Sequence, residues 1–117
     1  MASPRVSLTL GVRDVSVAVG QAVVVEPEEE LRLARATVRC AGCGTSRETV
    51  APPVFDTHDD DHFGRLELWY TTTHRARCGC GRDIEVVLGH TETRNLLTGG
   101  RSVACDGVRS ARGGALA

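Results

Sequence analysis

Two short stretches decide the fold of this chain: RCAGCG at residues 39–44 and RCGCG at residues 77–81. Each places two cysteines next to glycine, and glycine allows the sharp turn that brings two sulfurs to one metal ion. Structural zinc ions take four nitrogen or sulfur ligands in a tetrahedron, and pairs of closely spaced ligands are typical of them. The sequence therefore predicts one structural zinc site, formed by Cys40, Cys43, Cys78 and Cys80.

The surroundings of the cysteines favour metal binding over disulfide bonds. The N-terminal residues do not resemble an export signal, and the apolar segment 15–25 is interrupted and shorter than the about 20 residues of a membrane span. We therefore expect a cytoplasmic protein without a membrane segment, in a reducing compartment where clustered cysteines bind metal. The fifth cysteine, Cys105, is expected to be a packed or half-exposed thiol.

Outward from the cysteines, the chain has the pattern of β-strands. Apolar residues recur at every second position within 6–12, 15–19, 31–38, 66–70 and 84–88, which is the period of a strand with one buried face. Residues 22–26 are expected to be a further strand, and residues 51–64 a loop, because Pro52-Pro53 blocks regular structure and a very polar run follows. No segment has a convincing helical period. The sequence therefore predicts a mostly β fold, a small domain of antiparallel sheets or hairpins.

The two cysteine stretches resemble the knuckles of the zinc-ribbon group, in which Cys-x-x-Cys-Gly typically occurs twice at the tips of β-hairpins. The resemblance covers residues 33–89 and implies a structural zinc ion, a hairpin β core and often a binding role. The second knuckle departs from the pattern, because one residue instead of two separates its cysteines. His74 and Cys105 are therefore alternative candidates for the fourth ligand.

The resemblance leads to an expected division of the chain. Residues 1–98 are expected to form a single β domain, with N-terminal strands at 1–32 and the zinc-ribbon-like part at 33–89. Residues 99–117 are rich in glycine and arginine and are expected to be a poorly ordered tail.

The charged residues bear on the kind of partner. The net charge is −1 and every basic residue is an arginine, so Lys-dependent chemistry is excluded and the composition differs from that of a clearly basic nucleic-acid binder. Several arginines are expected around the metal. They can bind a partner, offset the negative charge of four thiolates on a zinc ion, or do both. These arginines are Arg39, Arg47, Arg75, Arg77 and Arg82.

Two patterns suggest catalysis, but each requires a helix that the sequence does not predict. His58 and His62 have the spacing of a zinc-protease helix, but they lie in the polar run after Pro52-Pro53. Redox Cys-x-x-Cys pairs open a helix, and no helical pattern follows Cys43. We therefore expect no enzyme, but a zinc-binding β domain acting as a protein-interaction or assembly module. The alternatives are a nucleic-acid-binding zinc ribbon and a thiol redox protein, and the oligomeric state is left open.

Overall fold

The computed structural model describes residues 4–117, and this part of the chain is built from β-strands without a helix. The mostly β fold of antiparallel sheets that the sequence predicts is thus confirmed. Among these residues there is no helix that is long and apolar enough to cross a membrane. The strands are β1 (Arg5–Leu10), β2 (Arg13–Ala18), β3 (Ala22–Val25), β4 (Leu31–Cys40), β5 (Ser46–Ala51), β6 (Val54–Asp60), β7 (Arg65–Arg77), β8 (Asp83–Asn95), β9 (Arg101–Arg112) and β10 (Gly114–Leu116).

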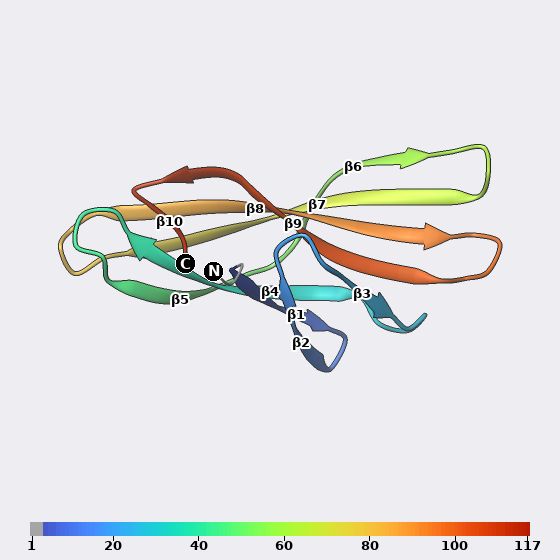
Figure 1. Ribbon diagram of the computed structural model, residues 1–117, viewed down its shortest axis with the longest axis horizontal. Helices are drawn as coiled ribbons and strands as arrows, with labels where there is room; N and C mark the ends of the chain where they lie inside the picture. The colour runs from blue at the N-terminus through green and yellow to red at the C-terminus, as the bar shows by residue number, and fades with distance from the viewer. Residues whose placement is uncertain (1–3) are drawn as a thin grey trace.

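The strands form two antiparallel sheets (Figure 1). In the first sheet, β4 is central: it pairs with β5 along one side, and with β1 and then β10 along the other, while β2 pairs with β1. The second sheet has the order β3-β9-β8-β7-β6. Its long strands β7, β8 and β9 run along the longest dimension of the molecule, which measures 51 × 27 × 25 Å.

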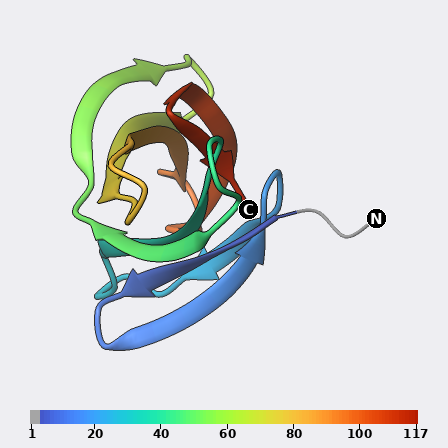
Figure 2. The same cartoon turned by 90° about the vertical axis from the view of Figure 1, so that its left-hand side faces the viewer.

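The chain passes between the two sheets four times: from β2 to β3, from β3 to β4, from β5 to β6 and from β9 to β10. The last two passages are short bends. Pro52-Pro53 separates β5 in the first sheet from β6 in the second, and Gly113 separates β9 in the second sheet from β10 in the first. Strands that switch sheets in this way make the corners of orthogonal sandwiches and small barrels. Viewed from the end, the strands accordingly curve around a common centre (Figure 2).

The core lies between the sheets, and the alternation in the sequence explains which side chains enter it. In β1 the second, fourth and sixth residues are buried, and β4 and β8 show the same period of two. Most of the core is aliphatic, as the low aromatic content requires. Its largest apolar members are Val6, Leu8, Leu10, Val38, Ile84, Val86, Leu88 and Val103.

Residues 51–64 are not simply the loop that the sequence predicts. Val54–Asp60 forms β6, the edge strand of the second sheet, and pairs with β7. All seven of its residues are exposed. An edge strand is held by backbone hydrogen bonds on one side only and needs no apolar face, and charged side chains there discourage pairing with other chains. The polar composition that suggested a loop is therefore compatible with a strand at this place.

Residues 99–117 are not the poorly ordered tail that the sequence predicts. Arg101–Arg112 forms β9, which pairs with β8 over most of its length, and Gly114–Leu116 forms β10. Val103 and Cys105 from β9 are fully buried in the core. The arginines that looked like features of a linker are instead ion-paired: Arg109 with Asp56, and Arg112 with Glu85.

A chain of buried hydrogen bonds crosses the core and determines which ring nitrogen carries the hydrogen in His74 and His90. The hydroxyl of Thr49 donates to the carbonyl of Ala36 (2.9 Å), so its oxygen accepts from Nδ1–H of His74 (2.9 Å). Nε2 of the neutral His74 ring then accepts from the Thr72 hydroxyl, and Thr72 accepts from Nε2–H of His90, both at 2.8 Å. Nδ1 of His90 is buried without a partner.

This polarity disfavours a charged His90, because protonation would create a buried donor with no acceptor. Burial lowers the pKa of His90 to about 4 from the ordinary 6.5, and a protonated His74 ring or the Arg109 guanidinium acts in the same direction. Burial also lowers the pKa of His74. Between about pH 4 and pH 6.5, His90 binds a proton in the unfolded chain but not in the folded chain. The free energy of unfolding therefore falls as the pH falls.

We predict that lowering the pH from 7 to 5 reduces the free energy of unfolding by about 2 kcal/mol through His90 alone. The substitution His90→Gln keeps a donor for Thr72 but cannot titrate, so it should remove this part of the pH dependence. Urea unfolding of both proteins at the two pH values measures the difference, with bound metal quantified in each sample. An imidazole pKa near 6.5 for His90 in an NMR titration of the folded protein would contradict the prediction.

Candidate metal centre

The two cysteine pairs lie in hairpin turns that close in the same way. In the first turn, Cys40 N donates to Thr45 O and Gly44 N donates to Cys40 O, both at 2.9 Å. In the second turn, between β7 and β8, Cys78 N donates to the carbonyl of Arg82, and the amide of Gly81 to that of Cys78, again at 2.9 Å. Gly44 and Gly81 both have positive φ angles, of 75° and 92°. The similarity of the two sequence stretches is therefore a similarity of local structure.

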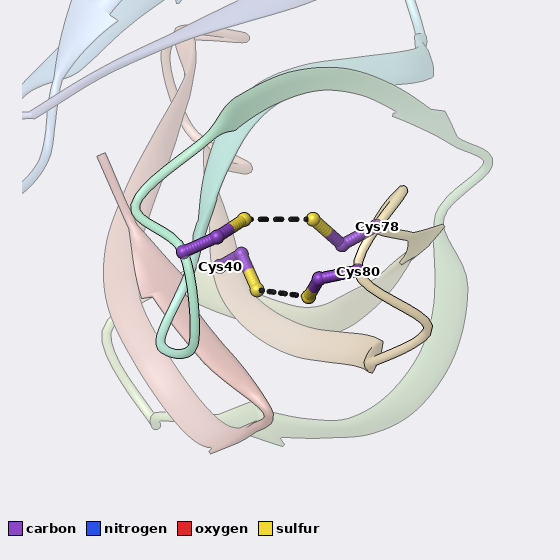
Figure 3. A group of neighbouring side chains, drawn as sticks. Cys40, Cys78 and Cys80 are labelled. Carbon is purple, nitrogen blue, oxygen red and sulfur yellow. Dashed lines mark hydrogen bonds between the residues drawn. The ribbon is translucent and has the colours of Figure 1, made fainter.

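Both turns project from the same end of the molecule (Figure 1), and their four sulfurs face one another (Figure 3). Sγ of Cys40 is 3.6 Å from Sγ of Cys80, and Sγ of Cys43 is 3.1 Å from Sγ of Cys78. All four sulfurs lie within 4.8 Å of one another. Zinc–sulfur bonds of about 2.3 Å in a tetrahedron place the sulfurs about 3.8 Å apart. The cluster has the dimensions of a four-thiolate metal site.

Each turn contributes one buried and one exposed cysteine. Cys40 and Cys78 are buried beneath the turns, and Cys43 and Cys80 lie at the surface. Hydrogen bonds with Thr45 and Cys78 lower the pKa of Cys43 to about 6. The backbone amide of Cys80 favours the thiolate of Cys78, but the contact with the Cys43 thiol, burial and the contacts with Cys80 and Cys40 together outweigh it and raise the pKa of Cys78 to about 11. Without a metal, the sulfurs of Cys43 and Cys78 are therefore held together by a shared proton. A metal cation would displace that proton on binding.

Two of the five predicted arginines contact the cysteine turns. Arg82, after the second turn, reaches the first turn, and Arg47, after the first turn, reaches the second. A Cβ atom built on Gly42 would be 3.0 Å from Nε of Arg82, and one built on Gly79 would be 3.8 Å from a terminal guanidinium nitrogen of Arg47. Four thiolates and a divalent cation together carry a charge of −2. Arg47 and Arg82 are therefore placed to offset that charge.

The other three predicted arginines lie on the strands that lead into the two turns. Arg75 and Arg77 line an open depression at the end of β7, and Arg39 is exposed on β4. A role of any of the five in binding a partner stays a prediction.

Neither alternative fourth ligand belongs to the sulfur cluster. His74 is bonded on both ring nitrogens to threonines in the core, and Cys105 is buried on β9 opposite His90. His58 and His62 lie on and after β6, at the exposed edge of the second sheet. Within residues 4–117, only the four cysteines form a group with metal-binding spacing.

Sequence reasoning missed the contribution of the sheet-crossing bend to this site. The amide of Ala41, in the first turn, donates to the carbonyl of Gly113 at 3.0 Å. A Cβ atom on Gly113 would lie only 2.0 Å from the carbonyl oxygen of Asp83, the first residue of β8 after the second turn. Gly113 therefore contacts Ala41 in the first turn and Asp83 directly after the second turn. The only signal in the sequence is the pair Gly113-Gly114, which also fits a flexible tail.

Comparison with known proteins gives no family for this chain: no protein-family model, no curated protein and no solved structure matches it. What the structure defines is a small antiparallel β protein with a candidate metal centre of four cysteines at one end.

Proposed function

We propose that the four cysteines hold one structural zinc ion and that the protein is a non-catalytic interaction or assembly module. The observation that carries the proposal is the approach of four thiols from two hairpin turns to within 4.8 Å. Four sulfur ligands in a tetrahedron are typical of zinc or iron–sulfur centres. With all four positions taken by protein, the zinc ion has no open position for a substrate, which is the mark of a structural site.

Cobalt substitution tests the geometry of this site. Cobalt(II) bound by four thiolates in a tetrahedron gives intense visible absorption, and zinc should displace it stoichiometrically. Bound zinc should also protect Cys43 and Cys80 from alkylation, although both are at the surface. Rapid alkylation of these cysteines in the zinc-loaded protein would instead favour a thiol redox protein.

The interaction role is supported by exposed apolar side chains at the end opposite the knuckles. Phe63 and Leu97 are 86% and 81% exposed, and Leu96 beside them is 59% exposed. The amide of Leu96 donates to Gly64 O at 2.7 Å, which joins the turns that carry these residues. Neighbouring exposed apolar side chains on a small protein indicate contact with another molecule. With a net charge of −1, a protein is favoured as that molecule.

A pull-down from cell extract tests the interaction role with three baits: the zinc-loaded protein, the Cys43→Ser variant and a Phe63→Ser/Leu97→Ser variant. We expect a specific protein to be retained by the zinc-loaded bait and reduced with both variants. Retention of the same proteins by all three baits would contradict a folded interaction module.

Nucleic-acid binding is the second candidate, and the arginines beside the knuckles favour it. It predicts affinity for DNA or RNA that falls steeply with salt and with the loss of Arg75 and Arg77. Binding that is insensitive to both changes would remove this candidate.

A further inference from the structure

We propose that the depression lined by Arg75, Arg77 and Arg112 binds a carboxylate side chain of an acidic segment of a partner protein. The inference rests on the proposed interaction role and names the chemistry of the partner. The depression has a volume of about 610 Å³ and lies beside the second knuckle, where β7 ends and β8 begins. It is lined by Arg75, Ala76, Arg77, Asp83, Ile84, Glu85 and Arg112.

Glu85 holds two of the arginines in fixed directions. Its Oε2 accepts from Nε of Arg75 and its Oε1 accepts from a terminal nitrogen of Arg112, both at 3.0 Å. Because Glu85 uses only one donor of each guanidinium, most of their N–H groups face solvent; the side chains are 74% and 79% exposed. The two guanidinium groups are therefore oriented in advance, which reduces the ordering entropy on binding.

Arg77 adds a third guanidinium without an ion pair among residues 4–117. Asp83 is its register partner on β8, but the two side chains form no salt bridge. A planar guanidinium with unused N–H groups binds a carboxylate through two parallel hydrogen bonds. Three guanidinium groups against the carboxylates of Asp83 and Glu85 leave a surplus of positive charge in the depression. The surplus of one positive charge suits one added carboxylate.

The composition of the lining favours an acidic protein segment over a nucleic acid. Asp83 and Glu85 lie within the depression and repel added negative charge, which a polynucleotide carries at every nucleotide and a peptide carries only at its acidic residues. The half-buried Ala76 adds a small apolar surface, which suits a peptide whose acidic residues are flanked by small apolar residues. The depression thus combines exposed guanidinium groups with a small apolar surface, which together suit an acidic segment of a protein.

The test uses a fluorescent peptide of alternating Glu and Gly, and the same peptide with Gln in place of Glu. Fluorescence anisotropy with zinc-loaded protein at low salt should give saturable binding of the Glu peptide only. The double substitution Arg75→Ala/Arg112→Ala should raise Kd at least about tenfold, because each lost charge-assisted contact costs about that factor. The matched control is Arg65→Ala, at the other end of β7, which pairs with Glu67 and is 58% exposed. It should change Kd less than about twofold.

Three results would overturn the inference. They are the absence of saturable binding, an equal loss of affinity in the Arg65→Ala control, and tighter, Arg75- and Arg112-dependent binding of single-stranded DNA. Metal content and thermal unfolding are measured on the same samples. A wild-type protein that holds its zinc and ignores the peptide refutes this inference and leaves the zinc module intact. A wild-type protein that holds no zinc refutes the proposed function first.

Discussion

Cys43→Ser is expected to lose the bound metal and the cooperative unfolding transition together. The free energy of zinc binding in small structural sites is about 10–16 kcal/mol, as large as the whole net stability of a typical domain, about 5–15 kcal/mol. Loss of one of four ligands removes much of that binding energy. Without the metal, the four thiols link the hairpin turn at 40–45 to the turn at 78–82 only through weak hydrogen bonds between sulfurs. We therefore expect a broad, non-cooperative denaturation of the metal-end hairpins.

Cys105→Ala is the matched control, because it removes a cysteine that lies outside the cluster. Cys105 is fully buried in the core, so its truncation should lower the free energy of unfolding by about 1–2 kcal/mol through lost packing. The variant should keep its metal and a sharp transition. Equal metal loss in the two variants, or a sharp transition in metal-free Cys43→Ser, would show that the cluster does not hold the fold together.

Gly113→Ala is expected to have the second-largest effect, a loss of about 4 kcal/mol or more from steric overlap and backbone strain combined. Gly113 has a φ angle of +72°, and an added Cβ would lie 2.0 Å from the backbone oxygen of Asp83. A backbone atom cannot move aside without displacing β8. Because Gly113 also accepts from Ala41, the displacement should reach the first knuckle and weaken metal binding.

Gly99→Ala separates the overlap from the strain of a left-handed backbone. Gly99 has a similar φ angle of +78°, but nothing lies within 4 Å of the position of its Cβ. The substitution should therefore lower the free energy of unfolding by only about 1 kcal/mol. Urea unfolding of both variants measures the difference. Equal effects of the two substitutions would mean that the contact between Gly113 and β8 does not stabilise the protein.

The cysteine cluster could be predicted from sequence because much of its evidence is local. Two cysteines beside a glycine define each turn, and the four ligands of a structural metal site then predict that two such turns meet. The alternation of apolar residues likewise predicted β1, β4 and β8, since a buried face on a strand needs only a period of two. These features depend on neighbouring residues rather than on the path of the chain.

The errors concern strands whose stability comes from distant partners. Arg101–Arg112 has the glycines and charges of a linker, yet β8 supplies its hydrogen bonds and Glu85 pairs with one of its arginines. Val54–Asp60 is a strand because β7 lies beside it, not because of its own composition. For the same reason Gly113 and Arg112 were missed as parts of the metal end. Their importance arises only when the last strand crosses between the sheets.

The most direct measurement is the metal content of the purified protein, determined by elemental mass spectrometry against protein concentration after growth with zinc and purification without added metal. We expect close to one equivalent of zinc per chain, lost in the Cys43→Ser variant and kept in Cys105→Ala. A cooperatively folded wild-type protein with fewer than about half an equivalent of any metal would contradict a structural four-cysteine site.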